Sequence, residues 1–177
     1  MWRIGVIVGL AFAASGAGAQ GLIADRDELT SRDRLLGWEA VGRLNLGGSG
    51  YCTGTLIATD LVLTAAHCLF SDTGPHDPAR IVFHAGLRGQ DAVASAPGLR
   101  AVAHPAYDPA KGTTAQNIRH DVALVQLATP IAAAVAAPFA VSHLPTGRAV
   151  SVVSYGRGRD DAPSWERAWG GKAAWWP

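Results

Sequence analysis

The sequence predicts an all-β fold from three observations. Between Trp38 and Tyr155 the apolar residues come in short runs, rich in Val, Leu and Ile and bounded by turn residues such as Gly, Pro and Asp. Hydrophobic residues make up 49% of the 177-residue chain and charged residues 16%, so the chain can bury a core. Beyond the N-terminus only 132–137 has a helix-like composition, and Pro130 and Pro138 bracket it. Many short strands with frequent turns indicate a β-barrel or a β-sandwich.

The first nineteen residues have the pattern of a secretory signal peptide. Arg3 supplies a positive charge, 4–14 are apolar, and 17–19 read as a small-x-small cleavage site before Gln20. This apolar run is too short to span a bilayer of roughly 30 Å, and no later run of about 18 apolar residues follows. We therefore expect a secreted or periplasmic protein, cleaved near Ala19, with no membrane contact afterwards.

The strands can be placed from the apolar runs and the turns between them. Residues 20–36 are polar and charged, which predicts an exposed lead-in. The Gly-rich stretch 47–50 predicts a hairpin turn, and 71–78 and 108–114 predict loops. We expect seven strands, near 39–46, 51–57, 60–65, 80–86, 99–104, 121–127 and 148–155.

The C-terminal stretch departs from this pattern. Four of the six tryptophans fall in 165–177, where neither a strand period nor a helix period is present. We expect 159–177 to be an aberrant Trp-rich tail.

Two cysteines and one histidine form the first candidate site. Export places Cys52 and Cys68 in an oxidising compartment, where a disulfide is the default. A loop of that length would stabilise the fold by roughly 3 kcal/mol in the chain-entropy model. Because His67 precedes Cys68, the bond would hold the turn that carries this histidine. The alternative is a surface histidine beside a structural cysteine.

An acidic residue opens the apolar run "HDVALVQL" at 120–127. Asp121 could be a solvated strand start. A histidine that acts as a general base, however, needs a carboxylate to fix its tautomer and to stabilise its charged form. His67 and Asp121 are the best such pair in the chain.

"LTAAHC" at 63–68, followed by "HDVAL" at 120–124, resembles the trypsin-like, chymotrypsin-fold serine proteases. The likeness includes "CTGTLIATDLVLTAAHC", "HPAYDP" and "VSVVSYGRG", and runs from about Gly37 to Gly158. "GWEAVGRL" is more similar to bacterial secreted members. The resemblance implies the first antiparallel barrel of a double barrel, with only the start of the second, and a protease domain over 37–158. It also implies that Cys52–Cys68 is the family's histidine-loop disulfide.

The same resemblance implies a role for each residue of the pair. His67 would be the general base and acid, and Asp121 would orient it. The family's serine nucleophile lies in a Gly-Asp-Ser-Gly-Gly-like turn, which this chain does not contain. The serines considered as substitutes either precede His67 or lack flanking glycines: Ser49, Ser151, Ser154 and Ser164. By family we expect a serine endopeptidase acting on proteins or peptides, and no activity from the chain as written.

Two interpretations of the missing nucleophile stay open. The first is an incomplete chain whose reading frame is lost just after Arg167. The second is a non-catalytic pseudoprotease that acts as a secreted binding module.

Other functional classes find little support in the sequence. The net charge of +1 and the absence of a Lys/Arg block give no reason to expect a nucleic-acid partner. No glycine-rich nucleotide motif is present. The possible metal ligands are scattered without a recognised spacing: His76, Asp77, His84, His104, His120 and Asp121. We therefore expect no metal and no cofactor, and we see no sign of an oligomer.

Overall fold

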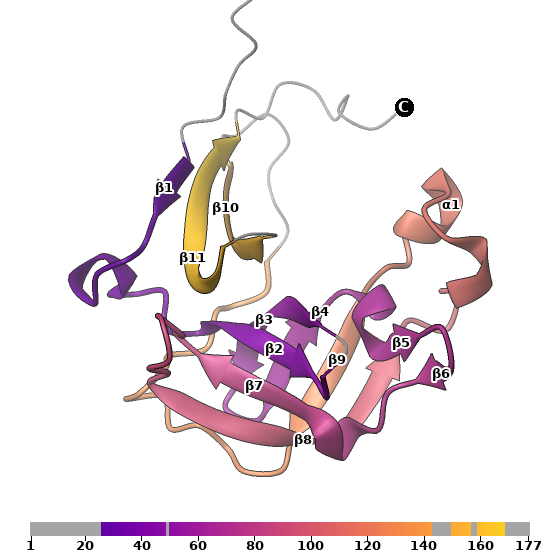
Figure 1. Cartoon of the computed structure of the whole chain (residues 1–177), viewed down its shortest axis with the longest axis horizontal. Helices are drawn as coiled ribbons and strands as arrows, with labels where there is room; N and C mark the ends of the chain where they lie inside the picture. The colour runs from indigo at the N-terminus through magenta and orange to yellow at the C-terminus, as the bar shows by residue number, and fades with distance from the viewer. Residues whose placement is uncertain (1–25, 49, 143–149, 157–158, 169–177) are drawn as a thin grey trace, which may run out of the picture.

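The computed structural model describes residues 26–48, 50–142, 150–156 and 159–168 (Figure 1). In this part of the chain six strands close an antiparallel barrel in the order β2-β3-β4-β9-β8-β7. Their bounds are β2 Val41–Leu46, β3 Tyr51–Ala58, β4 Leu61–Thr64, β7 Ile81–Ala85, β8 Ala94–Ala103 and β9 Ala123–Leu127. The all-β expectation is confirmed.

The remaining elements surround the barrel. A three-stranded sheet in the order β1-β11-β10 consists of β1 Arg26–Glu28, β10 Val150–Gly156 and β11 Arg159–Ala168, and it stands beside one end of the barrel (Figure 1). β5 Phe70–Ser71 pairs with β6 Gly74–Pro75. The helical turns are η1 Asp33–Leu35, η2 Ala66–Leu69, η3 Pro78–Arg80, η4 Pro109–Lys111 and α1 Ala115–Ile118.

The barrel interior is filled by alternate residues of its strands. The largest side chains that are fully enclosed there are Phe83, Leu44, Leu56, Ile81, Val62 and Val125. Each such side chain contributes roughly 1.5–3 kcal/mol through removal of apolar surface from water. Glycine is required at position 42 on β2, because a Cβ there would lie 2.5 Å from the ring of Phe83.

All seven predicted strands exist, but one begins earlier than expected. β8 starts at Ala94, whereas the sequence predicted a strand from residue 99. Pro97 and Gly98 favour a loop in isolation, yet Pro97 still joins the sheet through its carbonyl, which accepts a hydrogen bond from Ala128 N at 2.8 Å. Gly98 admits the close passage of η3, since a Cβ there would lie 2.6 Å from the Pro78 carbonyl oxygen.

Residues 159–168, the first part of the stretch expected to be an aberrant tail, form β11. This strand pairs with β10 on one side and β1 on the other. Pro163 cannot donate to a ladder, and it lies where the β10–β11 register shifts between Ser154 and Gly156. The backbone N–H of Tyr155 is thereby free to bond to Thr53 Oγ1 at 2.9 Å in the barrel.

The described part of the lead-in, 26–36, is partly buried, whereas its polar composition predicted exposure. Leu29 is only 6% exposed and Leu35 is fully buried. The guanidinium of Arg32 donates to the carbonyl of Gly86 at 3.3 Å, which fastens this segment to the barrel. The predicted signal peptide at 1–19, Ser49 and the tail from 169 lie outside the described residues.

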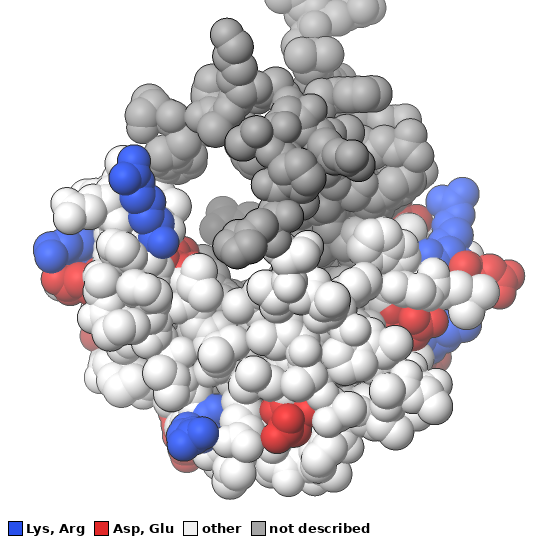
Figure 2. Space-filling model, turned by 180° about the vertical axis from the view of Figure 1, so that it is seen from behind, with Lys and Arg blue, Asp and Glu red and all other residues white. Residues whose placement is uncertain are grey.

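The described part of the face seen from behind carries few charges (Figure 2). Seen from behind, Lys and Arg stand close to Asp and Glu, and no large area of one sign is present on that face (Figure 2). Among the described residues, no helix is long and apolar enough to cross a membrane.

Candidate active site

The turn after β4 presents His67 to solvent. In η2 the neighbouring residues Ala66, Cys68 and Leu69 are buried, whereas the His67 side chain is 61% exposed. The apolar residues therefore fix the turn and leave the imidazole accessible.

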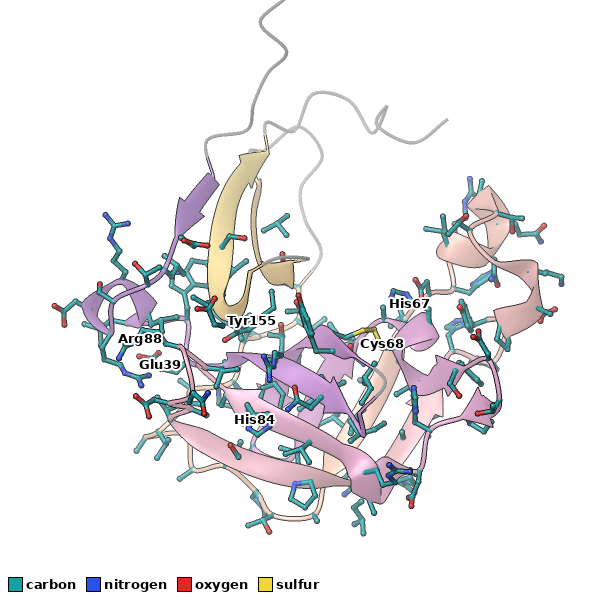
Figure 3. The ribbon with its side chains drawn as sticks, viewed as in Figure 1. Glu39, His67, Cys68, His84, Arg88 and Tyr155 are labelled. Atoms are coloured by element: carbon teal, nitrogen blue, oxygen red, sulfur yellow. A yellow bond between two sulfur atoms is a disulfide. The ribbon has the colours of Figure 1, made fainter. Side chains whose placement is uncertain are left out.

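A disulfide anchors the same turn. Cys52 on β3 is bonded to Cys68, as the sequence predicted (Figure 3). Because β3 is paired with β2 on one side and β4 on the other, the bond ties the histidine turn to the closed barrel. The nearest polar contact of His67 Nε2 is the Cys68 sulfur at 3.5 Å.

Asp121 reaches His67 from the segment that precedes β9. Its Oδ1 accepts the backbone N–H of His67 at 2.8 Å, and its Oδ2 lies 2.7 Å from His67 Nδ1. A carboxylate can only accept, so the ring proton resides on Nδ1 and the lone pair of neutral His67 resides on Nε2. That is the tautomer a general base requires when Nε2 faces the group to be deprotonated.

A pocket of about 430 Å³ adjoins this pair. Its lining is mostly apolar and consists of His67, Tyr107, Gly112, Thr113, Ile118 and Asp121. Burial raises the pKa of the Tyr107 hydroxyl, and the negative charges of Asp121 and Asp108 raise it further. Tyr107 therefore offers this pocket a neutral hydroxyl and an aromatic face.

The sequence pattern singled out His67 and Asp121 but not the other residues that line this pocket. Tyr107 stood in the "HPAYDP" motif, which could have indicated a role. Nothing in the sequence pattern singled out Ile118 or Gly112, since their place in the site depends on how the loop before Asp121 folds.

No serine hydroxyl in the described part of the chain is hydrogen-bonded to His67. Ser154 and Ser164 belong to the β10–β11 hairpin, where the Ser164 hydroxyl donates to the Ser154 carbonyl at 3.4 Å. Ser151 lies on β10 as well.

Three possible metal ligands also meet at this site. Among the described residues, the ligand atoms of Cys52, His67 and Cys68 lie within 4.8 Å of one another. The two sulfurs are bonded to each other, so neither can supply the thiolate that a metal would need. Of the other histidines, His104 stacks on His120 with ring centroids 4.8 Å apart, and His84 is bonded to Asn45 and Ser95.

The closed six-stranded barrel sets a disulfide-anchored histidine against a half-buried carboxylate, an arrangement compatible with the histidine and aspartate of a serine-protease triad. The comparison with known families agrees, because residues 31–168 match the family described as Trypsin. The chain belongs to the trypsin family.

Similarity to individual proteins supports the same family assignment. The chain is 36% identical over 135 residues to serine protease 56 of Homo sapiens, covering 73% of this chain and 21% of that protein. It is 35% identical over 119 residues to cathepsin G of Mus musculus, covering 62% and 40% respectively. The chain thus spans about a fifth to two fifths of the length of these relatives. Both are mammalian, so they lend no support to the expected likeness to bacterial members.

A solved structure supports the fold. The structure titled "Structure of Glu endopeptidase in complex with MPD" superposes with a TM-score of 0.62, covering 81% of this chain and 67% of that one. At 19% identity the likeness concerns the fold.

Proposed function

We propose that this chain provides the general base and the orienting carboxylate of an exported serine endopeptidase that cleaves proteins or peptides. The 2.7 Å contact between His67 Nδ1 and Asp121 Oδ2 carries the proposal. A disulfide-anchored turn, an adjoining apolar pocket and membership of the trypsin family support it.

The chemistry follows from the tautomer. Nε2 of His67 would take the proton of a serine hydroxyl as that oxygen attacks the scissile carbonyl, and would then return it to the leaving amine. Asp121 would hold the Nδ1 proton in place and stabilise the imidazolium formed between these steps. The apolar pocket would receive a substrate side chain close to the reacting bond.

The nucleophile is the part that these residues do not supply. The 177 residues contain no Gly-Asp-Ser-Gly-Gly-like turn, and the Ser164 hydroxyl is bonded within the β10–β11 hairpin. Proteases that lose one triad member keep some rate through their oxyanion hole and substrate binding. We propose that the 177-residue chain by itself hydrolyses no peptide, and that activity belongs to a protein that supplies this serine.

Two measurements test the proposal together. A fluorophosphonate that traps activated serines is expected to leave the purified chain unlabelled while labelling trypsin in parallel. Sequencing of the coding DNA past the codon for Pro177, translated in three frames, is expected to reveal a Gly-x-Ser-Gly turn followed by further strands. Labelling of the 177-residue chain would contradict the first expectation. Absence of such a turn in every frame would contradict the second and favour a secreted binding module.

A further inference from the structure

We propose that Asn117 is a positioning residue of the His67–Asp121 site. Its side chain closes the segment 108–120, here called the 108–120 loop, and so holds Asp121 and one wall of the pocket against His67. The purpose of this arrangement rests on the proposed function, but the arrangement itself can be measured without catalysis.

Asn117 is a polar side chain with almost no exposure, only 3%. Its Oδ1 accepts the backbone N–H of Asp108 at 2.9 Å, and its Nδ2 donates to the Asp108 carbonyl at 2.8 Å. The same Nδ2 donates to the carbonyl of Gly112 at 2.9 Å. One amide therefore satisfies both backbone groups of Asp108 and a third group in the middle of the loop.

These bonds require an asparagine. An aspartate could accept from the Asp108 N–H, but it would place a carboxylate against two carbonyl oxygens with no proton between them. An alanine would remove the side-chain partner of the Asp108 N–H, of the Asp108 carbonyl and of the Gly112 carbonyl, although the Asp108 carbonyl would still accept from Lys111 N at 3.1 Å. The loop would thus lose three hydrogen bonds that join its C-terminal end to Asp108 and Gly112, so it would open to water more easily.

The other contacts of the loop are local turn bonds, such as Lys111 N to the Asp108 carbonyl at 3.1 Å, and contacts on its surface. Residues 109–116 are all exposed, so they bury little apolar surface of their own. The Thr114 hydroxyl caps α1 at 3.4 Å from Asn117 N, and Lys111 pairs with Asp108 at 3.3 Å on the surface. Exposed pairs of the latter kind contribute at most about 1 kcal/mol.

The effect of Asn117 reaches the site through its neighbour Ile118. The backbone N–H of Asp121 donates to the Ile118 carbonyl at 3.1 Å, and His120 N donates to the Asn117 carbonyl at 3.0 Å. Ile118 and Gly112 also line the pocket beside His67. Asn117 itself touches neither His67 nor Asp121, so it acts on the site through the loop.

The experiment compares Asn117→Ala with Gln116→Ala, a control on an exposed residue of the same helical turn. Amide hydrogen exchange at Asp121 and the ¹H–¹⁵N signals of the His67 ring are measured by NMR in the purified chain. Asn117→Ala is expected to speed exchange at Asp121 by about tenfold or more, because local opening becomes easier. The signal of the His67 Nδ1 proton is expected to weaken or vanish. Gln116→Ala is expected to leave both unchanged.

The proposal is overturned if Asn117→Ala lowers the melting temperature yet keeps wild-type exchange at Asp121 and a wild-type Nδ1 proton signal. Asn117 would then stabilise the loop without positioning the site. If the alanine variant does not fold, Asn117→Ser is judged by the same two signals. Neither readout depends on hydrolysis, so failure of the proposed peptidase function would leave this result unaffected.

Discussion

The hydroxyl of Tyr155 donates a 2.8 Å hydrogen bond to the carbonyl of Leu87, joining the β10–β11 hairpin to the barrel (Figure 3). Both residues are buried, at 6% and 4% exposed, in a small cluster with Val41. Burial raises the pKa of Tyr155, although the bond to Leu87 opposes that shift. The hydroxyl therefore stays protonated and keeps donating throughout the physiological pH range. A second tyrosine, Tyr51, donates to the Gly156 carbonyl at 2.7 Å and reinforces the same junction.

Replacement of Tyr155 by Phe should destabilise the fold by about 1–3 kcal/mol, because the Leu87 carbonyl loses its buried partner. The free energy of unfolding from urea denaturation measures this change. Tyr51→Phe is the comparison variant: its hydroxyl lies in a half-buried place, so its cost should be smaller. Equal stabilities for wild type and Tyr155→Phe would show that water satisfies the carbonyl.

A chain of hydrogen bonds on the outside of the barrel keeps His84 neutral. Arg43 Nε donates to Asn45 Oδ1 at 2.8 Å, so the Asn45 amide nitrogen is turned toward His84 Nε2, 3.1 Å away. His84 Nε2 must then accept, and its Nδ1 proton faces Ser95 Oγ at 2.8 Å. If Nε2 of His84 were protonated, its N–H and the N–H of the Asn45 amide would both be donors and would repel each other. This arrangement also rules out Ser95 as a hydroxyl activated by His84.

The stability of the protein should therefore fall with acidification. Burial, and then the charge of Arg43, lower the pKa of His84 from its ordinary value of 6.5. The unfolded chain thus binds more protons than the folded chain below about pH 6.5. The stability that His84 contributes is present above that pH and is lost as the pH falls toward the folded pKa. Urea denaturation from about pH 7 down to about pH 5 should show a steeper loss for wild type than for His84→Gln. Parallel curves would refute this role of His84.

Removal of the Cys52–Cys68 bond should loosen the histidine turn as well as the whole fold. The double substitution of both cysteines by alanine should cost about 3 kcal/mol of unfolding free energy in the chain-entropy model. Amide exchange at His67 should accelerate more than exchange at Phe83 in the barrel core, because the bond is local to η2. Uniform acceleration at both positions would mean that the disulfide acts on global stability only.

The strands of the barrel could be predicted because their signal is local. Alternating burial in β7 and β9, and the glycine turn between β2 and β3, follow directly from residue type. β11 was not predicted because its pairing depends on β10 and on β1, and β1 is both distant in sequence and only three residues long. The early start of β8 was missed because Pro97 and Gly98 are tolerated there only through contacts with Ala128 and η3.

Only the His67–Asp121 pair of the site could be proposed from the sequence. A base needs an orienting carboxylate, and the motifs offered His67 and Asp121 for these roles. The pocket wall could not be predicted, because Ile118 reaches it only through the fold of the 108–120 loop. Asn117 binds backbone groups of Asp108 and Gly112 in that loop. Such bonds cannot be predicted from residue types, because every residue has the same backbone carbonyl.

The contact between Asp121 and His67 predicts that the imidazole carries its proton on Nδ1 and its lone pair on Nε2. Long-range ¹H–¹⁵N NMR of the neutral imidazole in the purified chain reports this tautomer directly. We expect a protonated Nδ1 and an unprotonated Nε2 in wild type, and loss of that preference in Asp121→Ala. A ring with its proton on Nε2 in wild type, or an unchanged tautomer in Asp121→Ala, would show that Asp121 does not set the tautomer.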